Sequence, residues 1–264
     1  MRFLFILATA SLWFVIESNN ASGQKNPQIT QIRGKTVEEW IKQIPSKDPS
    51  KGEEAIRTIL MFGPDRAMGA VPIVISELKN PGRNLDLKFR VMAVMSLGIT
   101  IGGAEKPDPQ LTSEAVAVLM RFSEDPQAIV RYRAAEALGR LDQDAKRAIP
   151  KIIILTKDRT TWEIREAATT ALGNITRHTK VAPSDEVFEV LISRLGDSAF
   201  PVRLAAVKSL IWVGTPANPK TKSKELKALK TCTLTDSDPT IRIWTNMAIM
   251  QLQGKGFPFP KLLP

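Results

Sequence analysis

Cysteine and histidine are almost absent from this chain of 264 residues, which contains one of each, Cys232 and His178. A single cysteine excludes an intramolecular disulfide and the class of disulfide-stapled domains. One histidine and one distant cysteine are too few for a zinc site, and they give no basis for a cysteine–histidine nucleophile pair. We therefore expect no metal, no cofactor and no catalytic residue.

Aromatic residues are scarce, at 6%, and acidic residues are outnumbered by basic ones. The 37 lysines and arginines against 27 aspartates and glutamates give a formal net charge of +10. Such a balance favours anionic partners in general, whether nucleic acid, anionic lipid or acidic polymer, and does not choose among them. The hydrophobic share of 43% is ordinary for a folded domain.

Long apolar runs are also missing, with one exception at the amino terminus. Arg2 is followed by an apolar run over residues 3–16, a polar stretch and the small residues that end at Gly23. This layout is typical of a secretory signal peptide, and the run is shorter than the roughly 20 residues that a membrane span requires. We expect cleavage before Gln24 and export to the periplasm or the extracellular space, with no transmembrane span in the mature chain; an uncleaved anchor is the alternative.

From about residue 85 onward, one short pattern recurs five times. An apolar residue and an arginine are followed by a small residue three positions after the arginine and by an aliphatic residue seven positions after it. The arginines are Arg90, Arg131, Arg165, Arg203 and Arg242, so consecutive copies are 41, 34, 38 and 39 residues apart. A period of this size is typical of a solenoid of helix pairs.

The pattern predicts where the helices lie. First helices are expected near 86–98, 126–139, 161–174, 200–212 and 239–251, and second helices near 112–122, 144–156, 184–195 and 222–232. A degenerate first repeat precedes them, with a capping box at Thr36–Glu39 and an N-cap at Asp48.

Each position of the pattern has a mechanical interpretation. The alanines at 93, 134, 168 and 206 let helix axes approach, and the aliphatic residues four positions later fill the space between paired helices. Gly98, Gly139 and Gly173 are expected at the left-handed position just past a helix end.

Aspartates stand six residues before three of the arginines, at Asp125, Asp197 and Asp236. Each acid is expected to cap its own helix, and each arginine can reach the aspartate of a neighbouring repeat. We interpret these positions as a structural arginine–aspartate ladder rather than as paired acids and bases. Its predicted members are Asp125, Arg131, Arg165, Asp197, Arg203, Asp236 and Arg242.

With its repeated Asp-x5-Arg-x2-Ala-x3-Leu-Gly signature, the chain resembles the HEAT-repeat superfamily over about residues 48–251, and most of all the repeats named after phycobilisome lyases. The segment Gly34–Trp40 resembles the opening of exported bacterial members. The resemblance implies an all-α, right-handed superhelical solenoid of about five to six stacked antiparallel helix pairs that binds other macromolecules. No chromophore-handling residues are found, so the lyase activity does not carry over.

A stripe of lysines is the candidate partner contact. With the degenerate first repeat counted, the second helix of the fifth pair is the one near 222–232. One side of this helix and of the residues just before it carries Lys220, Lys224, Lys227 and Lys230, and the other side carries Leu226 and Leu229. The resemblance implies that second helices line the concave face. A solvated surface is the alternative for these lysines. For Trp162, Trp212 and Trp244, core packing is expected, with a stacking platform as the alternative.

These observations divide the chain into a signal peptide over 1–23, a linker over 24–35 and a HEAT-like solenoid over 36–264 with a short proline-rich tail. We expect a monomeric, exported, non-catalytic interaction scaffold with a protein partner that the sequence does not identify. The alternative is a binder of nucleic acid or another acidic polymer that uses a basic concave face.

Overall fold

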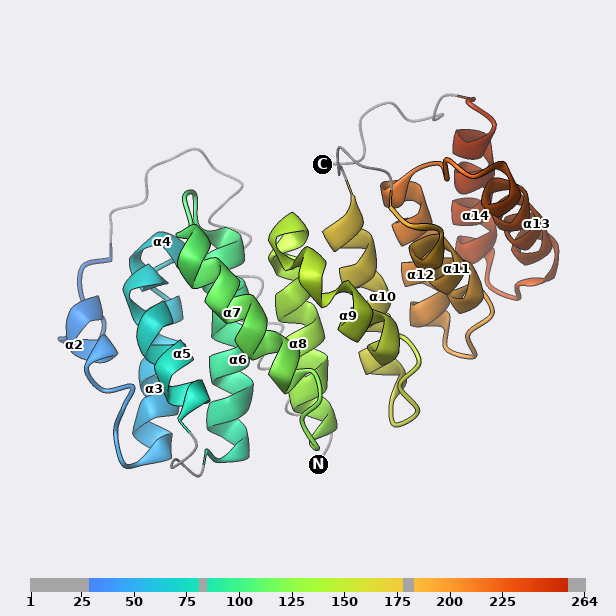
Figure 1. Cartoon of the computed structure of the whole chain (residues 1–264). Coiled ribbons are helices and arrows are strands. Elements are labelled where there is room, and N and C mark those ends of the chain that lie inside the picture. Colours follow the sequence, from blue (N-terminus) through green and yellow to red (C-terminus); the bar gives the residue numbers. More distant parts are fainter. Residues whose placement is uncertain (1–28, 81–84, 178–182, 256–264) are drawn as a thin grey trace.

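The computed structural model describes residues 29–80, 85–177 and 183–255. Within these ranges the regular structure is helical, apart from an isolated antiparallel bridge between Ile32 and Lys35. The α-helices are α2 (Val37–Ile41), α3 (Pro49–Leu60), α4 (Pro64–Ala67), α5 (Val71–Lys79), α6 (Leu87–Gly103), α7 (Pro109–Phe122), α8 (Ala128–Arg140), α9 (Ile149–Leu155), α10 (Trp162–Thr176), α11 (Asp185–Arg194), α12 (Phe200–Val213), α13 (Pro219–Thr235) and α14 (Pro239–Leu252), shown in Figure 1. Two 3₁₀ segments, η1 (Met68–Ala70) and η2 (Asp142–Ala148), precede α5 and α9.

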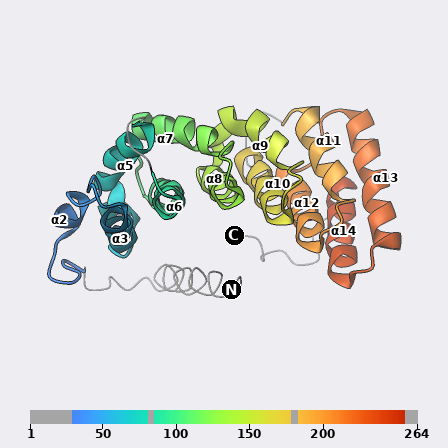
Figure 2. The same ribbon diagram turned by 90° about the horizontal axis from the view of Figure 1, so that it is seen from below.

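The helices form two rows that run side by side along an arc (Figure 2). The inner row consists of α3, α6, α8, α10, α12 and α14, and the outer row of α5, α7, α9, α11 and α13. The all-α solenoid of helix pairs predicted from the repeat period is therefore confirmed, and the predicted helices match the observed ones closely. The second helix of the third pair differs, because 3₁₀ turns precede the proline-bearing start of α9.

The expected orientation of the arc is wrong. The second helices were expected on the concave side, whereas Figure 2 shows that the first helices of the pairs line it and the second helices follow the convex side. The physical reason lies in side-chain volume. The first helices carry the recurring alanines and glycines, so they stack at short distances and form the shorter, inner side of the arc.

The glycines of the repeat occupy helix interiors and not helix ends. Gly98, Gly139 and Gly173 lie within α6, α8 and α10, so the predicted left-handed position is wrong. A Cβ added at these positions would lie 2.5 Å from Ala137 Cα, 2.9 Å from Ala171 Cα and 2.4 Å from Ser209 Oγ, respectively. The glycines are therefore required for the close approach of successive inner helices.

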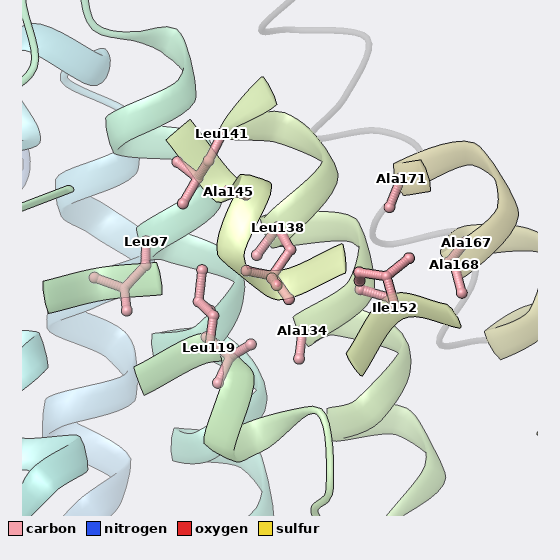
Figure 3. Close-up of a cluster of buried hydrophobic side chains, with 14 of the residues drawn as sticks. Leu97, Leu119, Ala134, Leu138, Leu141, Ala145, Ile152, Ala167, Ala168 and Ala171 are labelled. Carbon is pink, nitrogen blue, oxygen red and sulfur yellow. The ribbon is translucent and has the colours of Figure 1, made fainter. Parts of the chain in front are cut away.

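The core lies between the two rows and continues from repeat to repeat (Figure 3). The leucines seven positions after the arginines are buried, and this confirms the burial predicted for Leu138 and Leu172. Leu119 of α7 and Ile152 of α9 reach the same cluster from the outer row. The alanines at 93, 134, 168 and 206 are fully covered. The pattern positions thus form the packing surfaces of the solenoid.

Candidate interaction surface

Ion pairs connect the inner helices α6, α8, α10 and α12 to the repeat that follows each of them. Arg165 Nε and Nη2 each lie 2.8 Å from a carboxylate oxygen of Asp197, and Arg203 meets Asp236 in the same way at 2.7 and 3.1 Å. The two earlier contacts each use one carboxylate oxygen. Nε and Nη2 of Arg131 lie 3.2 and 3.1 Å from Asp158 Oδ2, and Nε of Arg90 lies 3.2 Å from Asp125 Oδ2. The arginine–aspartate ladder therefore joins neighbouring repeats.

The other nitrogen of the arginine fork fixes the loop in front of its own helix. Nη1 of Arg203 donates to the Asp197 carbonyl at 3.0 Å, and Nη1 of Arg131 donates to the Asp125 carbonyl at 2.9 Å. The aspartates were expected to cap their own helices, and this prediction is wrong. They accept the amide of the N-cap residue, as Asp197 Oδ1 does from Ala199 at 3.0 Å, and so close the turn before the helix.

Electrostatics identify Asp197 and Asp236 as ionised structural groups. Burial alone raises the pKa of Asp197, but hydrogen bonds from Arg165 and from the Ala199 amide outweigh it, so the pKa lies below its ordinary value. The same balance lowers the pKa of Asp236 through Arg203. A carboxylate held in this way does not exchange a proton near neutral pH, and so it is not suited to general acid–base chemistry.

One ladder acid was missed from the sequence. Asp158 is the partner of Arg131, yet it stands seven residues before Arg165 instead of six, so the fixed spacing passes over it. Its carboxylate also accepts from the amide and hydroxyl of Thr160, and it closes its turn as the others do. A search for an aspartate anywhere in the inter-helix turn finds it.

The lysine stripe lies on α13, in the outer row, and not on the concave side. Lys220, Lys224, Lys227 and Lys230 are exposed. The Nζ atom of Lys224 lies 2.9 Å from Glu189 Oε1 of α11, which offsets one of the four charges. A partner contact by these lysines stays a prediction, but a basic concave face built from them is wrong because α13 does not reach that face.

Glu225 lies on α13 with the lysine stripe, but it does not offset the lysine charge. Its side chain is directed into the protein, with 1% exposure, and its Oε2 atom has no hydrogen-bond partner among the described residues. Burial raises its pKa to about 8, against a small opposing effect from Lys222. Glu225 is therefore predominantly an uncharged carboxyl group at neutral pH.

The other residues singled out from the sequence are the tryptophans, Cys232 and His178, and those that the structure describes differ in how far they are buried. Trp162 is 42% exposed, so the expected core packing is wrong for it, whereas Trp212 and Trp244 are half-buried. Burial raises the pKa of the Cys232 thiol, which reduces its reactivity as a nucleophile. His178, the signal segment over 1–23 and the tail from residue 256 lie outside the described residues.

A different set of side chains crosses the concave side of the inner row. In each repeat, one residue lies midway between the small residue and the aliphatic residue, two positions from each. This residue lies opposite the buried face of its helix, because two residues span about 200° around the helix axis. These residues include Glu136, Thr170 and Lys208. With their neighbours they form what we call the inner stripe: Tyr132, Arg133 and Glu136 on α8, Glu166 and Thr170 on α10, Lys208 on α12 and Trp244 on α14.

Polar contacts hold the inner stripe together within its helices. Glu136 accepts from Tyr132 Oη at 2.9 Å and from Arg133 Nη1 at 2.6 Å. Glu166 accepts from Thr170 Oγ1 at 3.2 Å. These contacts fix the directions of side chains that are half-buried although they line an open face.

Electrostatic and ring contacts link the stripe from helix to helix. The pKa of Glu166 is raised, mainly by burial and further by Glu136 of α8, while Lys208 of α12 opposes the shift. The Nζ atom of Lys208 lies 5.0 Å from the centre of the Trp244 ring on α14, a cation–π distance. The stripe therefore acts as one surface across four helices.

The chemistry of the inner stripe suits recognition. It combines both charge signs, hydroxyl groups and an aromatic ring on rigid helices, which together complement the mixed side chains of a polypeptide. In residues 29–80, 85–177 and 183–255, no group of three or more histidine, cysteine, aspartate or glutamate side chains is placed to hold a metal ion. Within the same described ranges, no helix has the length and apolar character of a bilayer span.

Sequence reasoning missed the inner stripe because it followed the constant positions of the repeat. The stripe occupies positions where the copies differ, such as the fifth residue after each arginine: Met95, Glu136, Thr170, Lys208 and Met247. A scaffold keeps its packing positions constant from copy to copy, and a binding surface has no such requirement. The variable positions of the inner helices were therefore the available signal.

Comparisons with known proteins agree with this architecture. The family model for HEAT repeats matches residues 71–173. No curated protein sequence matches the chain. A HEAT-like repeats protein from the archaeon Thermococcus onnurineus NA1 superposes with a TM-score of 0.61 at 15% identity, covering 83% of this chain and 87% of that chain. A designed armadillo repeat protein in complex with peptide (KR)4 gives a TM-score of 0.64 at 16% identity, covering 82% of this chain and 99% of that chain. At this identity the likeness shows the fold alone.

Proposed function

Because the chain belongs to the HEAT-repeat superfamily, we propose that it is a non-catalytic scaffold that binds a protein partner along the inner row of its helices. The observation that carries the proposal is the inner stripe. Its half-buried charged groups and Trp244 are held in fixed directions on the concave side. Groups that are already ordered lose little conformational entropy on binding, which favours recognition.

The chemistry around the stripe supports binding more than catalysis. Glu136 is already paired with Arg133 and Tyr132, so it lacks the freedom of a general base. Burial raises the pKa of Tyr132 further above its ordinary value, which keeps its hydroxyl protonated. A precedent for peptide binding is the designed armadillo repeat protein that is in complex with the peptide (KR)4. A polypeptide segment is accordingly the partner class that we propose.

Export is the second part of the proposal. The charged, apolar and polar order of residues 1–23 supports synthesis with a signal peptide and action in the periplasm or outside the cell. Amino-terminal sequencing of the protein from its host is the test, and we expect a chain that begins at Gln24. Recovery of a cytoplasmic chain that begins at Met1 would contradict export without affecting the binding proposal.

The binding proposal is tested by charge reversal on the two faces. Lys208→Glu changes the inner stripe, and Lys146→Glu makes the same chemical change at an exposed site on η2, outside both the inner stripe and the lysine stripe. Each tagged variant is used to capture partners from envelope and culture fluid, with identification by mass spectrometry, after thermal melts show that both are folded. We expect Lys208→Glu to lose partners that Lys146→Glu retains. Equal retention by both variants would argue against the inner stripe as the binding surface.

A further inference from the structure

Arg242 stands at the ladder position of the last inner helix without the acid that the other ladder arginines have. Arg90, Arg131, Arg165 and Arg203 each contact an aspartate of the following repeat. No repeat follows α14 in the part of the chain that the structure describes, and no carboxylate there lies within ion-pair distance of Arg242. The sequence from Gln253 to Pro264 contains no aspartate or glutamate.

The guanidinium of Arg242 is nevertheless held in the same way as its counterparts. Its Nη1 atom donates to the carbonyls of Asp236 at 2.7 Å and Ser237 at 3.2 Å. Arg203 makes the equivalent pair of contacts, to Asp197 at 3.0 Å and Ser198 at 3.2 Å, and uses Nε and Nη2 for its acid. Arg242 therefore presents Nε and Nη2 in a geometry that in this chain binds a carboxylate.

The surface around Arg242 differs from the buried contacts between repeats. Ile243, next to Arg242, is 61% exposed, whereas the residues that follow the ladder arginines on α8, α10 and α12 are half-buried. Asn246, four residues after Arg242, is exposed. The equivalent residues in the preceding copies are apolar or threonine and fully covered: Val94, Ala135, Thr169 and Val207. The polar Asn246 favours a loop as the contacting element over another closely packed helix.

We propose that the exposed end of α14 binds an acidic loop of a partner protein. An aspartate of that loop takes the place on Arg242 that Asp236 takes on Arg203, and an adjacent apolar side chain covers Ile243. Charge complementarity and the continuity of this end with the interface between repeats support the assignment. The contact uses Arg242 and Ile243, which adjoin Trp244 of the inner stripe, and variants at Arg242 test it independently of the proposed function.

The first test uses a defined probe. The blocked peptide Leu-Thr-Asp-Ser-Asp-Pro-Thr, which is residues 234–240, carries the acid that Arg203 binds within the chain. In NMR titrations of the full chain, we expect this peptide to shift the Nε–H signal of Arg242. The signal is assigned by its absence from the spectrum of Arg242→Lys. A peptide with asparagine in place of both aspartates should bind at least about fivefold more weakly, since charged hydrogen bonds are the stronger ones. Equal binding of the two peptides, or binding that does not shift this signal, would overturn the proposal.

The second test addresses the partner in cells. A photo-crosslinking residue replaces Ile243 in the full chain, and the control carries it at Ile154 of α9, which is 62% exposed on the outer row. We expect the residue at position 243 to crosslink to a partner segment that contains an acidic side chain. These crosslinks should be lost with Arg242→Gln and when that acid is replaced by its amide, and they should be retained with Lys208→Glu. Crosslinks to this chain or a second copy, crosslinks unaffected by Arg242→Gln, or equal crosslinks at both positions would overturn the proposal.

Discussion

Arg165 of α10 holds both carboxylate oxygens of Asp197 at 2.8 Å, and this contact crosses the boundary between two repeats. Both side chains are largely covered, with 16% exposure for Arg165 and 5% for Asp197. The same aspartate accepts the Ala199 amide that opens α12. One carboxylate thus orients the turn before its own helix and connects that helix to the preceding one, so the ladder transmits the position of each repeat to the next.

Removing the arginine of this pair is expected to be costly. Arg165→Ala leaves the mostly buried Asp197 carboxylate with the Ala199 amide and with Arg194, whose Nη1 atom lies 3.5 Å from Oδ2. Because both close hydrogen bonds from Arg165 are lost, we expect a loss of about 3 kcal/mol of unfolding free energy, the lower end for a broken buried pair. The control is Lys224→Ala, which breaks the Lys224–Glu189 pair, in which both side chains are more than half exposed. Such a surface pair contributes less than about 1 kcal/mol. Urea melts measure both, and equal losses would contradict the structural weight given to the ladder.

The lowered pKa of Asp197 predicts a dependence on acid. The folded state holds the carboxylate with a pKa below its unfolded value, so the folded state binds this proton less readily. The stabilisation is fully present above about pH 4, the ordinary aspartate range, and is lost as the pH falls through the folded pKa. Asp197→Asn removes that proton site. Its unfolding free energy should fall less steeply below pH 4 than that of the parent, and parallel profiles would show that Asp197 is not the linked group.

Glu225 predicts the opposite dependence. Its pKa is raised to about 8 in the folded protein, so its contribution is fully present below the unfolded glutamate pKa of about 4.3 and is lost as the pH rises through 8. Glu225→Gln keeps the shape and removes the charge. We expect the variant to be more stable than the parent at pH 9 and similar to it at pH 5. Glu186→Gln, at an exposed site on α11, is the control and should change neither value.

The fold was predictable because its information is local and repeated. The interval between the arginines, the alanines and leucines at fixed distances from them, and the capping box at Thr36 are all visible in the sequence, and the helices occur where these signals place them. The orientation of the arc was not predictable in the same way. It depends on the relative volumes of two rows, and hence on Gly98 and its counterparts facing a neighbouring backbone, a relationship between residues about 40 positions apart.

The candidate site was less predictable than the fold. Asp158 was hidden by a one-residue change in spacing, and Glu225 carries no sequence signal that distinguishes a buried carboxyl group from a solvated one. The inner stripe combines residues of four helices, and its coupling through Glu166 exists only when α8, α10 and α12 lie side by side. The lysines of α13 were predicted to be exposed, and they are; their row in the solenoid required the structure.

Nearest-neighbour packing predicts a large effect at the centre of the array. Leu138 of α8 is fully buried between the rows (Figure 3), so Leu138→Ala removes contacts and leaves a cavity. We expect a loss of about 2–5 kcal/mol. Glu186→Ala, on the exposed side of α11, should stay within about 0.5 kcal/mol. Urea melts compare the two variants, and similar values would mean that the burial of Leu138 does not govern stability.

The glycine positions provide a test in which two effects have opposite signs. Helix propensity alone predicts that Gly98→Ala in α6 stabilises the protein by about 1 kcal/mol. The structure predicts the reverse, because a Cβ at Gly98 would lie 2.5 Å from the Cα and 2.7 Å from the Cβ of Ala137, and neither atom moves without shifting α8. We expect a net loss of about 1–3 kcal/mol, the usual cost of overpacking. Gly196→Ala is the matched control, since its added Cβ meets nothing nearer than the Ser193 carbonyl oxygen at 3.9 Å, and it should be nearly neutral. A stability gain in Gly98→Ala would show that the inner helices do not depend on this close approach.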